Sequence, residues 1–224
     1  MQFKQAMQQN ITKYKTRLFL LTLICSLTAF GQGQIKTTNL DLTKLPNGIN
    51  FNGKIKTAVR WTDKSGDNII ITTETGEKTS KKVEPTDDFR EAAIHAYHYI
   101  VNNDSTILTW KVYDFIKDCS FDIEASFIKN SFQVTDLNED GVAEIWIMYK
   151  TVCTSDVSPC DMKIIMYQGQ QKFAMRGKNK VKISDKEFYG GEYKFDHAFA
   201  DGPKEFLEFA RKLWNKNIMQ TWGE

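Results

Sequence analysis

The sequence predicts a mainly β protein of the α+β class, a single domain of antiparallel sheet and hairpins with a C-terminal amphipathic helix. Short runs rich in β-branched and aromatic residues recur along the chain, and turn signals separate them. Apolar residues recur at helical spacing most clearly near the C-terminus. The turn signals are Asn47-Gly48, Ser65-Gly66-Asp67, Thr75-Gly76-Glu77, the loop from Asp136 to Glu144, and Tyr189-Gly190-Gly191.

The strands are expected where these runs alternate between apolar and polar residues. In chain order they are Thr57 to Asp63, Asn68 to Thr73, Ile94 to Val101, Ile107 to Phe115, Phe121 to Phe127, Phe132 to Thr135, Ala143 to Lys150, Met162 to Tyr167 and Lys172 to Met175. The segment from Asp88 to Ile100 is ambiguous because its alanines permit a helix. Its second half is heavy in aromatic and branched residues, which favours a strand.

The clearest helix is expected from Pro203 to Met219. Proline suits the first turn of a helix because it lacks the N–H that would be unpaired there. One face carries Phe206, Phe209, Ala210, Leu213, Trp214 and Ile218. We expect this face to dock on the sheet rather than on a partner helix, because amphipathic helices ordinarily bury their apolar face in their own core.

Residues 1–31 are typical of a signal peptide. Four basic residues precede an apolar run from Leu18 to Phe30, and Ala29-Phe30-Gly31 has the small-x-small pattern of a cleavage site. The run is shorter than the roughly 20 apolar residues that span a bilayer. We therefore expect cleavage after Gly31 and an exported protein of residues 32–224, without a membrane span, in the periplasm, at the cell surface or secreted.

Loss of this leader changes the charge balance, because it removes four basic residues and no acidic ones. The remainder has 26 Lys and Arg against 28 Asp and Glu. The densest basic cluster, Lys178 to Lys182, is followed by Asp185 and Glu187. We interpret it as a solvated strand face, and we expect no nucleic-acid partner because phosphate binding needs a concentrated basic surface.

The loop from Asp136 to Glu144 has the spacing of a calcium loop. Oxygen-bearing side chains stand at positions one, three, five and nine, and Gly141 at position six can take the sharp turn. The expected calcium ligands are the side chains of Asp136, Asn138, Asp140 and Glu144 and the backbone carbonyl of Val142. The alternative is a metal-free turn, since Asp, Asn and Gly are also ordinary turn residues. Glu139 is expected to point into solvent.

The loop is not an EF-hand, because position twelve is Ile147 where that motif needs a bidentate glutamate. Its flanks are predicted strands, which places the ion in a β-hairpin connection. The pattern resembles the DxDxDGxxD loops of FG-GAP repeats, with Asn138 and Glu144 as departures that keep an oxygen ligand. No second DxNxDG pattern occurs, which argues against a complete propeller.

The exported chain keeps Cys119, Cys153 and Cys160, enough for one disulfide and one free thiol in an oxidising compartment. Cys153 and Cys160 would close a short loop. Cys119 instead follows a strand that could neighbour the strand of Cys153, which favours a bridge between Cys119 and Cys153.

Catalytic motifs give little support to an enzyme. The sequence has no GxSxG, HExxH or phosphate-binding glycine loop. Ser126 and Lys129 match SxxK, but they fall in a predicted strand where the two side chains would not stack. His95 and His98 would point to opposite sides of a strand, so we interpret each as structural.

The run from Val134 to Gly177 resembles an exported bacterial family labelled surface polysaccharide biosynthesis protein. The likeness rests on the VTDLNEDGVAE loop, the DVSP turn at Asp156 to Pro159, the KIIMY strand and the final Arg176-Gly177, with the upstream run from Trp110 to Asp118. The resemblance implies a one-domain exported protein with one calcium-type loop, in which Cys119 and Cys153 pair. The label names a pathway and no mechanism.

Three functions follow as hypotheses. We favour a noncatalytic exported calcium-binding protein that acts as a binding or accessory component at the cell surface, with a surface glycan or a cell-envelope protein as partner. The second is a component or enzyme of surface polysaccharide biosynthesis. The third is a carbohydrate-binding module, in which sugar rings would stack on exposed Trp61, Trp110, Trp146 or Trp222.

Overall fold

The computed structural model describes residues 35–80, 89–103 and 105–219. The expected signal peptide, residues 1–31, lies outside the described residues. The protein is mainly β, with 55% of the described residues in strands and 11% in helices, which confirms the predicted class. All sheet pairings are antiparallel within the described strands.

The first sheet has the strand order β1-β2-β3-β5-β6, and β4 lies beside the start of β5 on the β3 side. Its strands are β1 (Thr38–Asn39), β2 (Lys54–Asp63), β3 (Gly66–Glu74), β4 (Lys78–Thr79), β5 (Arg90–Asn102) and β6 (Ser105–Cys119). The segment whose sequence permitted either a helix or a strand belongs to β5 from Arg90 onward, so the predicted strand is confirmed. Its branched and aromatic side chains are buried on both faces of the sheet.

The second sheet has the strand order β7-β9-β10-β11-β14, and β8 pairs with β9 beside β7. Its strands are β7 (Asp122–Phe127), β8 (Gln133–Thr135), β9 (Glu144–Thr154), β10 (Asp161–Gln168), β11 (Gln171–Lys178) and β14 (Tyr193–Phe195). A separate hairpin joins β12 (Lys180–Lys182) to β13 (Phe188–Gly190). A Cβ at Gly177 would come within 1.9 Å of the Glu192 carbonyl, so glycine permits β14 to lie against β11.

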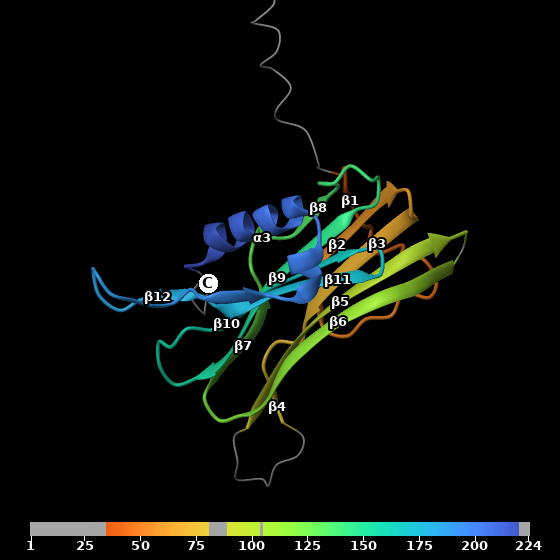
Figure 1. Cartoon of the computed structure of the whole chain (residues 1–224). Coiled ribbons are helices and arrows are strands. Elements are labelled where there is room, and N and C mark those ends of the chain that lie inside the picture. The colour runs from red at the N-terminus through yellow and green to blue at the C-terminus, as the bar shows by residue number, and fades with distance from the viewer. Residues whose placement is uncertain (1–34, 81–88, 104, 220–224) are drawn as a thin grey trace, which may run out of the picture. The chain divides into compact units, whose positions relative to one another are not determined.

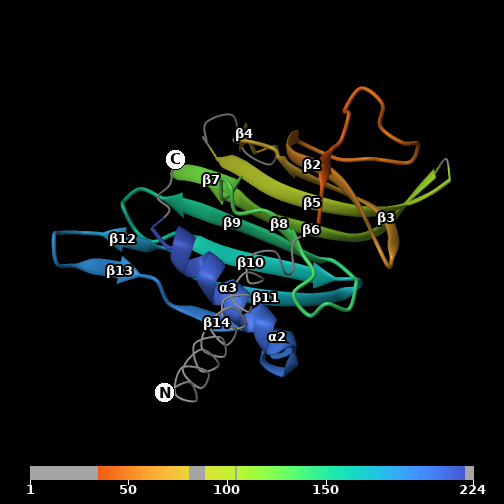
Figure 2. The same ribbon diagram turned by 90° about the horizontal axis from the view of Figure 1, so that it is seen from above.

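The two sheets stack face to face, and helix α3 lies on the outer face of the second sheet (Figures 1 and 2). Apolar side chains from both inner faces form the central core, which includes Trp61, Ile94, Ile147 and Ile165. A second core lies between the second sheet and the helices and includes Trp146. The strands β9 and β10 are thus buried on both faces, which explains their nearly continuous apolar sequences.

The outer face of the first sheet is covered by the segment 40–52. Ile69, Ile71, Tyr97 and Tyr99 form a small core there. The Tyr99 hydroxyl donates to the Asn50 carbonyl at 2.5 Å, and the Tyr97 hydroxyl accepts from the Asn52 backbone N–H at 3.1 Å. These hydrogen bonds satisfy both tyrosines and fasten the segment to the sheet.

The C-terminal helix α3 spans Lys204–Asn217, with Pro203 as its N-cap residue. It is shorter than the predicted range of 203–219 by one residue at the start and two at the end. Its face with Phe206, Ala210, Leu213 and Trp214 is buried against the sheet, as expected.

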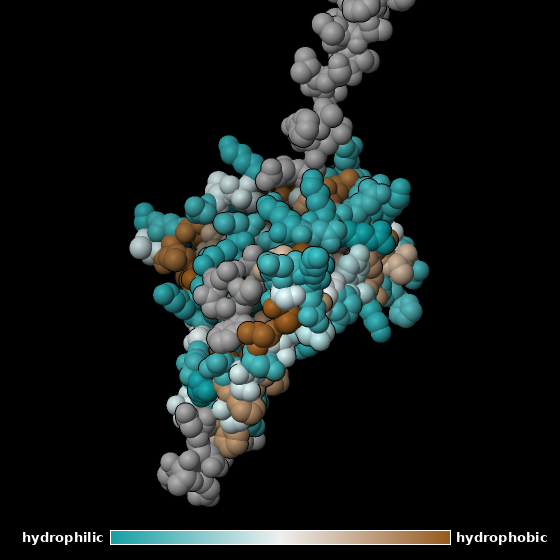
Figure 3. Space-filling model, turned by 90° about the vertical axis from the view of Figure 1, so that its left-hand side faces the viewer, coloured by the Kyte–Doolittle hydropathy of each residue, from teal (hydrophilic) through white to brown (hydrophobic). Residues whose placement is uncertain are grey.

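Hydrophilic side chains predominate on the face of the molecule drawn in Figure 3, and hydrophobic ones form separate small patches.

Several short elements had no sequence prediction. They are β1, β4, β13, β14 and a short helix α2 (His197–Asp201), whereas β12 falls in the segment from Lys178 to Lys182 that we interpret from the sequence as a strand face. The Asp196 side chain caps α2 by accepting from the Phe199 N–H, and Phe199 is fully buried. Such short elements carry too few residues for a periodic pattern and depend on contacts with distant segments.

None of the helices in the described ranges is long and apolar enough to span a bilayer.

Candidate functional site

The predicted calcium loop connects β8 to β9 as a β-hairpin. Thr135 and Glu144 are cross-strand partners at its base, so the prediction of strand flanks is confirmed. Gly141 has φ of +83° and takes the sharp turn, as expected. Glu139 also has a positive φ of 56°, and its side chain is exposed, which agrees with the expected outward position.

Four of the five predicted ligands surround a single atom, Nε2 of Gln168 at the end of β10. This nitrogen lies 3.3 Å from Asn138 Oδ1, 2.9 Å from Asp140 Oδ2, 3.4 Å from the Val142 carbonyl and 3.4 Å from Glu144 Oε1. A primary amide has two N–H donors, so it cannot satisfy four acceptors at once. The loop therefore presents more oxygen acceptors than the protein has donors for at this point.

Asp136 adds a further unsatisfied oxygen. Its Oδ2 accepts from the Gly141 N–H at 3.0 Å, which holds the turn closed. Its Oδ1 is buried and has no hydrogen-bond partner among the described residues. A buried acceptor without a partner is uncommon in a folded protein, and its desolvation costs about 1 to 3 kcal/mol.

Glu144 is fully buried at 0% exposure. Its Oε2 accepts from the Thr135 hydroxyl at 2.7 Å and the Leu137 N–H at 2.9 Å. Burial raises the pKa of this carboxyl, hydrogen bonds from Thr135 and Leu137 oppose the rise, and the charges of Asp136 and Asp140 add to it. None of the ion pairs among the described residues involves Glu144. The charge of Glu144 is thus offset by no direct ion pair among these residues, and the ammonium group of Lys64 donates to the Asp140 backbone carbonyl.

These donors fit a hard cation, because they are all oxygens and include three carboxylates. Within residues 35–80, 89–103 and 105–219, no three or more His, Cys, Asp and Glu side chains are arranged to hold a metal by themselves. Two of the three carboxylates, Asp140 and Glu144, contact the Gln168 amide nitrogen, and Asp136 instead accepts from the Gly141 N–H. The other two oxygens near Gln168 Nε2 are the Asn138 amide oxygen and the Val142 backbone carbonyl.

The turn between β2 and β3 fastens the loop to the first sheet. The Lys64 N–H donates to the Gly141 carbonyl at 2.8 Å, and its ammonium group donates to the Asp140 carbonyl. Asp63 Oδ2 accepts from the Ala143 N–H at 3.0 Å. The loop and the end of β10 belong to the second sheet, so the candidate site lies where a turn of the first sheet meets it.

Sequence reasoning missed Gln168, Lys64 and Asp63. Asp63 ends a predicted strand, Lys64 precedes the turn signal Ser65-Gly66-Asp67, and Gln168 begins a polar run after a predicted strand. No local pattern marks any of them as part of the loop, because they lie between 24 and 80 residues away from the atoms that they contact.

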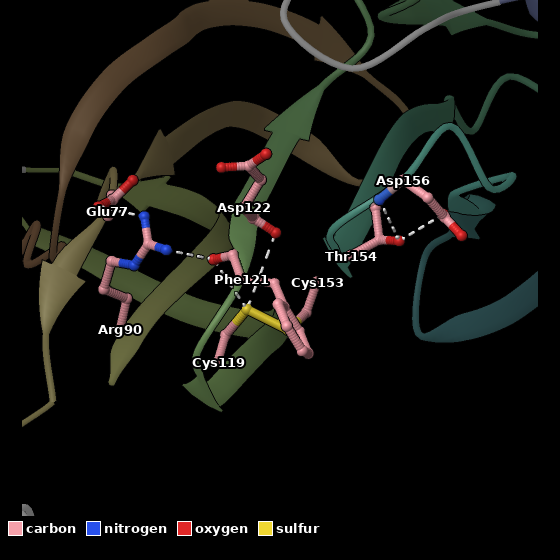
Figure 4. Close-up of a disulfide and its surroundings, with 8 residues drawn as sticks. All are labelled: Glu77, Arg90, Cys119, Phe121, Asp122, Cys153, Thr154 and Asp156. Atoms are coloured by element: carbon pink, nitrogen blue, oxygen red, sulfur yellow. Dashed lines mark hydrogen bonds and ion pairs between the residues drawn. A yellow bond between two sulfur atoms is a disulfide. The ribbon is translucent and has the colours of Figure 1, made fainter. Parts of the chain in front are cut away.

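The predicted disulfide between Cys119 and Cys153 is present, with 5.9 Å between the Cα atoms (Figure 4). It joins the end of β6 in the first sheet to β9 in the second. Arg90 lies beside it, pairing with Glu77 at 3.1 Å and donating to the Phe121 carbonyl at 2.6 Å. Cys160 is free and buried, as expected, and burial raises the pKa of its thiol.

The remaining sequence candidates are structural. Trp61, Trp110 and Trp146 are all buried, so none offers an exposed face to a sugar ring, and Trp222 lies outside the described residues. Ser126 is in a strand, where its hydroxyl donates to Glu124 at 2.5 Å, so SxxK does not form a helical pair.

His95 and His98 occupy opposite faces of β5, as predicted. His95 stacks on Tyr113, and His98 stacks on Trp110 in the central core. Burial lowers the pKa of each to about 4.

The chain was compared with protein-family models, curated proteins and solved structures. No family model matches it, and neither comparison with individual proteins found a significant match.

Proposed function

We propose that this protein is an exported, noncatalytic calcium-binding protein that acts as a binding or accessory component at the cell surface. The observation that supports calcium is the convergence of loop oxygens on Gln168 Nε2, beside the buried Glu144 carboxylate that has no cationic partner. Calcium takes six to eight oxygen ligands, which matches this donor set.

The ion would be held by Asp136, Asn138, Asp140, the Val142 carbonyl and Glu144. Gln168 supplies a further ligand, because a half-turn of its amide presents Oε1 in place of Nε2. The loop also contacts the turn that carries Asp63 and Lys64. The role of calcium is thus structural: it neutralises the loop carboxylates and stiffens the junction of the two sheets.

The experiment is thermal unfolding of the protein with calcium and with chelator. For a dissociation constant of about 0.1 mM, about 1 mM free calcium adds about 1.4 kcal/mol of stability. For a domain of this size that corresponds to an increase in Tm of about 3 to 6 °C. Isothermal calorimetry gives the affinity directly.

Two loop variants make the test specific. Asp140→Ala removes a carboxylate that faces Gln168 and should abolish the increase in Tm. Glu139→Ala removes an exposed carboxylate from the same loop and should keep it. Identical melting of the wild type with calcium and with chelator, together with no calorimetric heat at millimolar calcium, would show that the loop is only a turn.

The surface role needs its own measurement. The mature protein, loaded with calcium, should bind a surface glycan or a cell-envelope protein in a binding screen. Retention of binding by Glu139→Ala and its loss in Asp140→Ala would connect the partner to the calcium-stiffened loop.

A further inference from the structure

Three basic side chains stand side by side across the second sheet. In the strand register Lys163 on β10 is the cross-strand partner of Arg176 on β11, and Arg176 is the partner of Lys194 on β14. Directly opposed residues of antiparallel strands point to the same face, and like charges in such positions destabilise a sheet. We name Lys163, Arg176 and Lys194 the basic row.

The row lies on the face that builds the central core elsewhere. Ile165 on β10 and Ala174 on β11 belong to that core. Lys163 is two residues from Ile165 and Arg176 is two residues from Ala174, so both point to the same face of the sheet as the core residues. The Lys163 ammonium group pairs with Asp114 on β6 at 2.5 Å, so it does point toward the first sheet. The charged residues thus continue the inward-facing rows beyond the buried core, where Arg176 and Lys194 are exposed.

Two clefts adjoin the row, each of about 390 Å³. Lys163 and Arg176 line both of them. Lys194 lines the first, and Lys111 and Lys172 line the second, which lies against β6. The clefts give a small molecule access to the row from two sides.

Acidic side chains neutralise only part of the row, because Asp114 pairs with Lys163 alone among its members. Asp114 is the single acidic residue of the second cleft, and its Oδ2 already accepts from Lys163 and from the Tyr149 hydroxyl at 2.9 Å. In the first cleft, Asp161 pairs with Lys178 at 2.8 Å. Glu192 lines the same cleft, but none of the ion pairs among the described residues includes it.

Arg176 and Lys172 have no direct ion pair, although the charges of Asp196 and Asp114 favour the charged form of Lys172 from a greater distance. Neither side chain forms an ion pair or hydrogen bond with another residue that the structure describes. Burial lowers the pKa of Lys172, and the charge of Arg176 lowers it further. At Arg176, β11 pairs with β10 on one side and with β14 on the other. Arg176 therefore does not lie on an edge strand, where a charged side chain often prevents pairing with another chain.

We propose that the basic row and Lys172 form a binding site for a small molecule with multiply charged oxyanion groups. Adjacent strands are about 4.8 Å apart, so the row presents cations at a spacing that suits a phosphate between two of them or two carboxylates of one ligand. The guanidinium of Arg176 can hold either group with two parallel hydrogen bonds. This site is separate from the calcium loop and independent of the proposed function.

The test is calorimetric titration of the whole protein with inorganic phosphate and with succinate, at constant ionic strength in calcium-free buffer. Phosphate binding alone would assign the site to phosphate-bearing ligands, and succinate binding alone to dicarboxylates. Acetate, with one carboxylate, should bind at least tenfold more weakly than succinate. Absence of heat with both phosphate and succinate at millimolar concentrations would overturn the proposal.

Arg176→Gln should weaken binding at least tenfold, and Lys172→Gln should weaken it by a smaller factor. Lys212→Gln, which removes an equal charge from the exposed face of α3, should change it less than twofold. Without anion, Arg176→Gln should melt no lower than the wild type, because it relieves the repulsion in the row. Equal affinities of Arg176→Gln and Lys212→Gln would refute the site.

Discussion

At the residue scale, His98 is a buried titratable group whose ring has one hydrogen-bond partner among the described residues. Its Nδ1 lies 2.5 Å from the Thr109 hydroxyl, while its Nε2 is buried without a partner among the described residues. The ring stacks on Trp110 at 5.0 Å and tilts against Trp61 at 5.5 Å. Burial disfavours the imidazolium form, and the opposing effect of Asp63 is smaller, so the pKa falls to about 4.

This pKa predicts a loss of stability in mild acid. The unfolded chain protonates His98 near its ordinary pKa of 6.5, and the folded chain only near 4. Below pH 6.5 the unfolded state therefore binds more protons, and stability falls as the pH decreases toward 4. Between pH 7 and pH 5 this single group should cost about 2 kcal/mol.

Urea unfolding of His98→Phe at pH 7 and pH 5 measures this contribution. The variant should lose about 2 kcal/mol less stability than the wild type over this interval, because phenylalanine does not titrate. His197→Asn, a substitution at an exposed histidine, is the matched control and should keep the wild-type dependence. An unchanged pH dependence in His98→Phe would mean that other groups cause the acid sensitivity.

At the element scale, the disulfide connects the sheets through β6 and β9. It closes a segment with a sequence separation of 34 residues that includes β7, β8 and the candidate calcium loop. In the chain-entropy model, a bridge of this length stabilises the fold by about 3 to 4 kcal/mol.

The double variant Cys119→Ser/Cys153→Ser should therefore lose about 3 to 4 kcal/mol in urea unfolding. Cys160→Ala, which keeps the bridge and truncates a buried thiol, should lose less. Nonreducing peptide mapping of the wild type gives an independent check. A peptide that joins Cys153 to Cys160 would contradict the assignment.

At the scale of the whole molecule, the predicted export would determine the environment of both candidate sites. An oxidising compartment suits the Cys119–Cys153 bridge, and calcium-rich surroundings suit a loop of modest affinity. Removal of residues 1–31 would also change the excess of basic residues, 30 against 28 in the full chain, to a small excess of acidic ones.

The mature protein should begin near Gln32. The basic start, the apolar run from Leu18 to Phe30 and the Ala29-Phe30-Gly31 pattern all predict cleavage after Gly31. Intact mass spectrometry of the protein from its native host measures this directly. A mass that includes Met1 would remove the basis for export.

The disulfide between Cys119 and Cys153 was predicted from an expected neighbourhood of two strands. The sequence by itself also predicted the β class, the positions of the long strands along the chain, the C-terminal helix and the hairpin position of the loop. These features depend on local patterns, such as alternation along a strand, glycine in a turn and apolar spacing on a helix. Asp136, Asn138, Asp140 and Glu144 could be named because they belong to one short segment.

Only the tertiary structure brought Gln168 to the centre of that loop and placed Lys163, Arg176 and Lys194 in one row. Each of these contacts joins strands whose residues lie apart in the sequence, and their register depends on the packing of the whole sheet. The same packing buried Trp61, Trp110 and Trp146, which composition alone could not distinguish from exposed aromatic residues. Local patterns determine elements, whereas sites assembled across strands exist only after the sheets have formed.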